Sequence, residues 1–139
     1  MNMTIHDKIK NSDYVVFADE EIIIVLDFDP ITKGHVLILP QKNYMDIDEL
    51  PEMTLNRLFK AAQAYVQIIK AKYSPKGYTI MQNGGEYNDI GVFHLHVFPR
   101  FEKEEFGYRK MSNKAVVRRI ELSKLFENEI MKSRENDAY

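Results

Sequence analysis

The chain contains no cysteine among its 139 residues, so disulfide frameworks, cysteine-based zinc sites and thiol nucleophiles are excluded. It also lacks an excess of charge of one sign, since 19 basic and 21 acidic side chains leave a net charge of −2. This balance provides no electrostatic basis for binding nucleic acid or an anionic membrane surface. Nucleic acids and membranes are therefore not expected as partners.

Long apolar runs are absent as well. The longest aliphatic run, Ile22–Leu26, is far shorter than the ~20 residues of a membrane-spanning helix. The segment from Met1 to Asp7 lacks the apolar stretch of a signal peptide. We therefore expect a soluble cytoplasmic protein. Its length indicates one domain, residues 1–139, that buries about two-thirds of its unfolded surface and needs no disulfide or metal to fold.

Short β-branched and aromatic segments lie on both sides of one long amphipathic segment. Between Pro51 and Tyr73, apolar residues recur at the i, i+3, i+4, i+7 spacing of a helix. A last helix is expected to begin at Ser112 or Asn113. This order predicts an α+β fold with a mostly antiparallel sheet, one long helix and a C-terminal helix. The five expected strands are residues 14–17, 22–26, 35–39, 78–81 and 92–100.

The strand expected at residues 92–100 has an unusual composition. Side chains alternate between the faces of a strand, so His94 and His96 share one face, about 6–7 Å apart at Cα. The other face carries only apolar side chains and is expected to pack in the core: Phe93, Leu95 and Val97. The strand therefore presents a pair of imidazoles on a firmly packed support.

Several interpretations of this histidine pair remain open. His-x-His is a common metal-ligand pair, and Glu86, Asp89 or His35 is a candidate third ligand. One imidazole can instead be a nucleophile whose neighbour donates a proton. The pair can also bind a ligand without catalysis, or consist of partly buried structural histidines. The motif alone does not separate these alternatives.

The segment resembles the signature of the histidine triad (HIT) superfamily, in which histidines alternate with apolar residues before Pro-Arg. Residues 27–40 resemble the upstream block of that family: an acidic residue at a strand end, a proline-containing loop, Gly-His, and an apolar strand ending in proline. Residues 82–84, Gln-Asn-Gly, resemble the turn before the triad strand. The resemblance covers residues 5–103 as a HIT-like core and leaves residues 104–139 as a C-terminal extension with a helix.

The resemblance implies an antiparallel sheet with a long helix, usually paired into a homodimer, and binding of a purine nucleotide. It implies hydrolysis or transfer of a nucleotidyl group, here expected to be adenylyl, with no cofactor and no metal. Phosphoramidates and dinucleoside polyphosphates are the expected substrate types. The alternative is a nucleotide-binding module with little or no turnover, and a metal-dependent hydrolase ranks third.

The resemblance also assigns roles to the histidines. His94 matches the nucleophile that forms a covalent nucleotidyl-histidine, with its other ring nitrogen donating to a backbone carbonyl. An ordinary imidazole is largely neutral at pH 7, so it needs no prior deprotonation to attack phosphorus. His96 matches the histidine that contacts phosphate oxygens or passes a proton to the leaving group. His35 matches a histidine that supports the others from behind.

Further residues match the nucleotide-binding positions of the family. Asp27 matches the acidic residue whose oxygens accept the ribose hydroxyls. Phe28 and Ile22 are candidates to sandwich the base, and the alternative for each is a place in the core. The residues expected around the phosphate are Gln82, Asn83, Asn88 and Asp89, with Gln82 opposite the family's amide residue. Backbone N–H groups of this loop are expected to help hold the anion.

The chain departs from the family pattern at several positions. Val92 replaces the first histidine, which should slow the reaction about ten- to hundredfold, and a histidine restored there should recover part of the rate if the ring fits. Asn88 and Asp89 stand where many members have glutamine and a small hydroxyl residue, and Asp89 brings a negative charge near the phosphate unless it points away or holds a cation. The Cys-x-x-Cys of zinc-bearing relatives is absent, and His6 alone cannot replace it. Basic residues near the C-terminus are expected to form a solvated face: Arg109, Lys110, Lys114, Arg118 and Arg119.

Overall fold

The computed structural model describes residues 3–102 and 119–137. The chain divides into two compact units, residues 1–106 and 107–139, and each is described by itself. In the second unit, α3 (Arg119–Asp137) is the described element, and its backbone confirms a C-terminal helix. The expected helix start at Ser112 or Asn113, and the basic residues from 109 to 118, lie outside the described residues.

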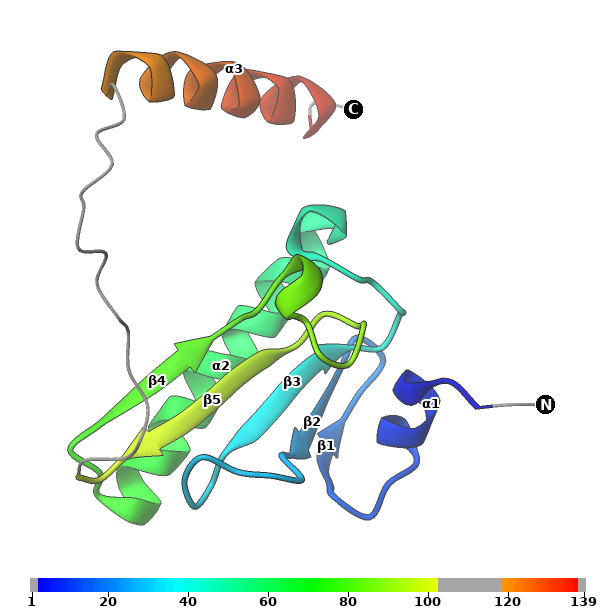
Figure 1. The fold of residues 1–139 in the computed structure, drawn as a ribbon, viewed down its shortest axis with the longest axis vertical. Helices are drawn as coiled ribbons and strands as arrows, with labels where there is room; N and C mark the ends of the chain where they lie inside the picture. Colours follow the sequence, from blue (N-terminus) through cyan, green and yellow to red (C-terminus); the bar gives the residue numbers. More distant parts are fainter. Residues whose placement is uncertain (1–2, 103–118, 138–139) are drawn as a thin grey trace. The chain divides into compact units, whose positions relative to one another are not determined.

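The first unit is built on a five-stranded antiparallel sheet in the order β1-β2-β3-β5-β4 (Figure 1), which confirms the predicted architecture. β1 and β3 are each shifted by one residue toward the C-terminus, β4 begins one residue earlier than predicted, and β2 lies where it was expected. The fifth strand begins at residue 95 rather than 92, because the N–H of Phe93 donates to the Tyr44 carbonyl at 2.7 Å and does not pair with β3. The strands are β1 (Val15–Ala18), β2 (Ile22–Leu26), β3 (Val36–Pro40), β4 (Gly77–Met81) and β5 (Leu95–Arg100).

The long helix α2 (Glu52–Tyr73) lies across one face of this sheet (Figure 1). It follows Pro51, and it ends at Tyr73, before Ser74, whose φ of 45° is in the left-handed region. The buried side of α2 meets side chains from β2, β3 and β5. This core comprises Ile22, Val36, Ile38, Leu58, Ala61, Ala62, Val66, Phe93, Leu95 and Val97.

A short N-terminal helix, α1 (Ile5–Lys10), was not expected from the sequence. Thr4 and Asp7 form a capping box that satisfies backbone N–H groups at its start, and the Thr-x-x-Asp spacing was the available signal. Ile9 of α1 packs in a second apolar cluster, on the face of the sheet opposite α2. The other buried members of this cluster are Val25, Leu37, Leu39 and Val92.

Two 3₁₀ turns complete the first unit: η1 (Ile47–Glu49) before α2 and η2 (Gly85–Tyr87) between β4 and β5. None of the helices in the two described stretches combines the length and hydrophobicity that crossing a membrane requires.

Candidate functional site

The segment around β5 has core side chains on one face and the two histidines on the other, as the strand alternation predicted. Phe93, Leu95 and Val97 are buried in the core beneath α2. The rings of His94 and His96 lie together on the other face, with their centroids 4.8 Å apart. The apolar side chains therefore anchor the backbone that holds the histidine pair.

His94 has a defined ring orientation. Its Nδ1 lies 2.9 Å from the Val92 carbonyl oxygen, and because a carbonyl only accepts, Nδ1 carries the proton and donates it. A neutral ring that donates from Nδ1 keeps its lone pair on Nε2. That Nε2 faces the carboxylate of Asp89, with Oδ1 at 3.8 Å. The His94 side chain is 1% exposed, whereas the Asp89 side chain is 82% exposed.

The loop that carries Asp89 is held by the side chain of Asn88. Its Nδ2 donates to the carbonyls of Met45 (3.2 Å) and Val92 (3.0 Å), and its Oδ1 accepts from the N–H groups of Ile90 (3.3 Å) and Gly91 (3.1 Å). The Val92 carbonyl thus accepts from both Asn88 and His94. This use of the amide was not expected from the sequence, which assigned Asn88 to the nucleotide.

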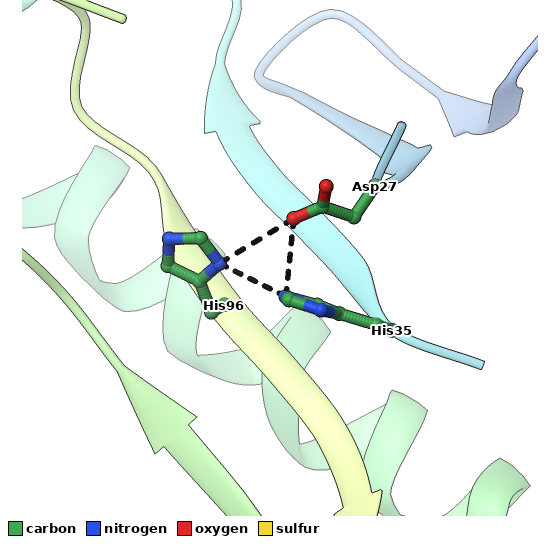
Figure 2. A group of neighbouring side chains, drawn as sticks. All are labelled: Asp27, His35 and His96. Carbon is green, nitrogen blue, oxygen red and sulfur yellow. Dashed lines mark hydrogen bonds and ion pairs between the residues drawn. The ribbon is translucent and has the colours of Figure 1, made fainter. Parts of the chain in front are cut away.

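His35 lies behind His96 and is oriented by the backbone. The N–H of Ile31 donates to His35 Nδ1 at 3.0 Å, so the proton of the neutral ring is on Nε2. From there it is donated to Nδ1 of His96, 2.9 Å away. Asp27 Oδ2 lies 3.3 Å from His35 Nε2 and 3.7 Å from His96 Nδ1 (Figure 2). His96, accepting at Nδ1, then carries its own proton on Nε2.

Burial lowers the pKa of both inner histidines. For His96 the pKa falls to about 4, because burial disfavours the imidazolium and the neighbouring His94 and His35 add to the effect, against the attraction of Asp27 and Asp89. For His35 burial again lowers the pKa, and Asp27 opposes the shift. Both rings are therefore neutral at pH 7, which agrees with the hydrogen bonds that join them.

The same three side chains lie close enough to suggest a metal site. One ligand atom each of Asp27, His35 and His96 falls within 4.8 Å of the others. A histidine nitrogen must be unprotonated to bind a metal, however, and the Ile31 N–H keeps the proton of His35 on the nitrogen that faces this group. The geometry therefore favours a hydrogen-bonded network over a metal centre, and the group includes neither Glu86 nor Asp89.

Of the residues expected to contact the base, the structure exposes one and buries the other. Phe28 is 58% exposed and meets the ring of Tyr14 edge-on, with centroids 4.9 Å apart. Ile22 is fully buried in the core under α2, which favours the alternative that it is a core residue over a place against a base. Tyr14 was missed, because an aromatic residue beside a strand carries no signal that links it to Phe28. Asp27 follows β2 and accepts the Asp29 N–H at 2.8 Å through Oδ1.

Gln82 follows β4 directly, and the preceding residue, Met81, pairs with His96 across the strands. Within the part of the chain that the structure describes, Gln82 Nε2 is a buried side-chain atom without a hydrogen-bond partner. A buried donor left unpaired is costly, so its presence marks a place where a ligand oxygen can bind. Asn83 follows, partly exposed, on the same loop.

Part of the loop expected to hold phosphate is occupied by a carboxylate. The N–H of Gly85 donates to Asp46 Oδ2 at 3.3 Å, and a Cβ added at Gly84 would lie 3.0 Å from Asp46 Oδ1. Asp46 also caps η1. The Gly85 N–H is therefore engaged within the protein, which leaves Gln82 as the better-supported contact for a phosphate.

Comparison with known proteins agrees with this fold. A family model described as the HIT domain matches residues 8–103. An uncharacterised HIT-like protein of Methanocaldococcus jannaschii is 36% identical over 90 residues, which cover 63% of this chain and 69% of that protein. An adenylylsulfatase of Arabidopsis thaliana is 27% identical over 92 residues, 64% of this chain and 46% of that protein. The crystal structure of a HIT family protein from Bacillus anthracis superposes with a TM-score of 0.69 at 28% identity, covering 86% of both chains. The chain therefore belongs to the HIT family, whose members bind nucleotides and include nucleotide hydrolases.

Proposed function

We propose that this chain is a nucleotidyl hydrolase or transferase of the cytoplasm that works through a covalent nucleotidyl-histidine at His94. The observation that carries the proposal is the hydrogen bond from His94 Nδ1 to the Val92 carbonyl, which directs the lone pair of the ring to Nε2. The Arabidopsis relative supports the reaction class, because its name is that of an enzyme acting on an adenylyl group.

The reaction takes place in two displacements. In the first, His94 Nε2 donates its electron pair to the α-phosphorus and the bond to the leaving group breaks. The leaving group departs with the electron pair of that bond and, where it is an amine, takes a proton from solvent, because His96 is neutral and its Nε2–H only donates a hydrogen bond to it. In the second, water attacks phosphorus: its oxygen stays on the nucleotide with one proton, the other proton is released to solvent, and His94 recovers its electron pair. In the transferase reaction another acceptor replaces water.

The remaining residues are proposed to hold the nucleotide. Asp27 accepts from the ribose hydroxyls, and Phe28, exposed beside Tyr14, offers an aromatic face to a purine. Gln82 donates its unpaired N–H to a phosphate oxygen. Asn83 lies next to it on the same loop.

A binding module with little turnover is the second candidate. Val92 replaces the first histidine of the family motif, and it lies in an apolar cluster where it offers the nucleophile no side-chain hydrogen bond. A site of this kind would still recognise a nucleotide through Asp27, Phe28 and Gln82.

Trapping the intermediate tests the proposal. The wild-type protein is mixed with adenylyl substrates labelled at the α-phosphate, quenched in alkaline denaturant, and analysed for label on the protein and for the labelled peptide. Label on the peptide containing His94, and none on the His94→Ala variant, is the expected result. If the protein binds AMP but acquires no label and turns over none of the substrates, the proposal of an enzyme is wrong and the protein is a binding module.

We also propose that the chain forms a homodimer through β4. This strand lies at an edge of the sheet and exposes two large apolar side chains, Tyr78 (45%) and Ile80 (40%). Sedimentation of wild type and Ile80→Lys tests the pairing, and a monomeric wild-type protein at micromolar concentration would contradict it.

A further inference from the structure

The side chain of Asn88, expected beside the nucleotide, is fully engaged with the protein backbone. A side-chain amide has two N–H donors and an oxygen that accepts two hydrogen bonds. The donors are used on the carbonyls of Met45 and Val92, and the oxygen accepts from the N–H groups of Ile90 and Gly91. No capacity remains on this amide for a phosphate, so its contribution to the site has to run through the backbone that it holds.

One of these bonds reaches the peptide group between Val92 and Phe93, which is held on both sides. In a trans peptide the N–H and the C=O point in opposite directions. The N–H of Phe93 donates to the Tyr44 carbonyl at 2.7 Å. The carbonyl of Val92 accepts from Asn88 Nδ2 at 3.0 Å. The pairs of β5 with its neighbours begin at Leu95, so these bonds rather than strand pairing fix the plane of the peptide.

Asn88 also ties this peptide to the segment after β3. Its second donor goes to Met45, the residue next to Tyr44, so both sides of the peptide are bound to the same segment. Without the amide, His94 Nδ1 would be the remaining donor that the structure places on the Val92 carbonyl. The direction of the carbonyl would then follow the ring instead of setting it.

The direction of this carbonyl matters because a second acceptor lies near the other nitrogen of the His94 ring. Nδ1 donates to the Val92 carbonyl at 2.9 Å, whereas Nε2 lies 3.8 Å from Asp89 Oδ1. The His94 side chain is 1% exposed, so these two acceptors, rather than bulk water, compete for the proton of the neutral ring. A proton on Nε2 would remove the lone pair that must attack phosphorus.

We propose that Asn88 is a positioning residue for His94: it holds the Val92 carbonyl in place and thereby keeps the ring proton on Nδ1 and the lone pair on Nε2. The inference rests on the proposed function, since the role of His94 as the nucleophile gives the position of this proton its importance. The proton can be located without any turnover, however, so the two can be tested separately.

Nitrogen-15 NMR of the imidazoles at about pH 8, where an ordinary histidine is neutral, locates the proton. The His94 signals are identified by their loss in His94→Ala. Asn88→Ser keeps a hydroxyl that can accept from N–H groups further along the turn, but it cannot bridge the two carbonyls. In this variant we expect the proton to be shared between Nδ1 and Nε2 of His94. The rate of adduct formation at saturating substrate should fall about tenfold, while the dissociation constant of AMP stays within about twofold of wild type.

Two further variants separate positioning from loop stability. Asn88→Asp keeps the length of the side chain and its acceptor bonds but cannot donate to the Val92 carbonyl, so the His94 proton should move as in Asn88→Ser. Asp46→Ala is the matched control. It removes the bond to the Gly85 N–H and the cap of η1, at the other end of the loop, and should leave the proton on Nδ1 although the protein becomes less stable.

The outcomes distinguish this inference from the proposed function. A proton that moves in both Asn88 variants but not in Asp46→Ala supports the inference, even if no protein forms an adduct. An unchanged proton position in Asn88→Ser, or an equal shift in Asp46→Ala, overturns it, and an adduct on His94 would then leave the proposed function standing. Binding of AMP that weakens about tenfold in Asn88→Ser with the proton still on Nδ1 would also overturn it, because Asn88 would then be a nucleotide contact.

Discussion

The two faces of the segment around β5 are built from alternate residues of one stretch of chain but have different tasks. Toward α2, Phe93, Leu95 and Val97 are buried among aliphatic side chains and have no polar atoms to satisfy. On the opposite face, His94 and His96 are also largely buried, yet every ring nitrogen whose contacts are described faces a specific partner. Burial alone therefore does not distinguish the core from the site. The two faces differ because the site side chains have polar atoms that meet specific partners, and the core side chains have none.

Replacing His94 on the chemical face should have the largest effect. His94→Ala removes the proposed nucleophile, so we expect turnover to fall by at least about a thousandfold. The loss in stability should be small, about 1–2 kcal/mol, because the Val92 carbonyl keeps its bond from Asn88. Kinetics and urea unfolding of the same preparation measure both quantities. Activity above a tenth of wild type would remove His94 as the nucleophile.

Replacing its neighbour on the packing face should give the opposite pattern. Leu95 is 1% exposed in the core, so Leu95→Ala leaves a cavity and should lower the free energy of unfolding by about 2–5 kcal/mol. In the fraction that remains folded, trapping of the adduct should persist. If Leu95→Ala abolished the adduct at full stability, the division between the two faces would be wrong.

Acid should lower the free energy of unfolding, because His96 on the face with the histidines resists protonation in the folded protein. The folded pKa of His96 is lowered to about 4 from an unfolded value near 6.5, so between these values the unfolded chain binds more protons and stability falls as pH falls. By pH 4, this one group lowers the free energy of unfolding by up to about 3 kcal/mol relative to neutral pH. Urea unfolding from pH 7 to pH 4.5 should show a smaller loss for His96→Asn than for wild type. Parallel losses in the two proteins would show that His96 remains free to protonate in the folded state.

The smallest expected effect is that of restoring a histidine at residue 92. Val92 is 5% exposed in the cluster with Ile9, so the space that a larger, polar ring requires is not there. Val92→His should therefore lower stability by about 1–3 kcal/mol and give no gain in single-turnover rate. Val92→Ile, which adds volume without polarity, serves as the matched control. A faster and equally stable Val92→His would show that the family's first histidine is still accommodated.

Much of the fold was predictable because its elements have clear periods. The 3.6-residue period of α2 and the alternation around His94 and His96 depend on local sequence, and both predictions were confirmed. The start of β5 and the whole of α1 were not predicted, since they depend on a backbone bond to Tyr44 and on a cap at Thr4.

The site was less predictable, because its geometry depends on contacts between distant segments. The histidine face followed from alternation, but the proton position on His35 depends on the N–H of Ile31, which every residue except proline provides. Tyr14 immediately precedes β1 and Phe28 follows β2, so the two rings meet only in the folded chain. The sequence left Ile22 between a base contact and the core, because an aliphatic side chain suits either place, and the fold puts it in the core.

The acceptor that orients His94 is a main-chain oxygen, and this has a consequence for how the motif can evolve. Any of the twenty amino acids at residue 92 supplies the same carbonyl, so a substitution there changes the packing against Ile9 without removing the acceptor. Exchange of histidine for valine at that position therefore changes the side chain beside His94 and its packing, but not the acceptor that fixes the position of the proton on the His94 ring.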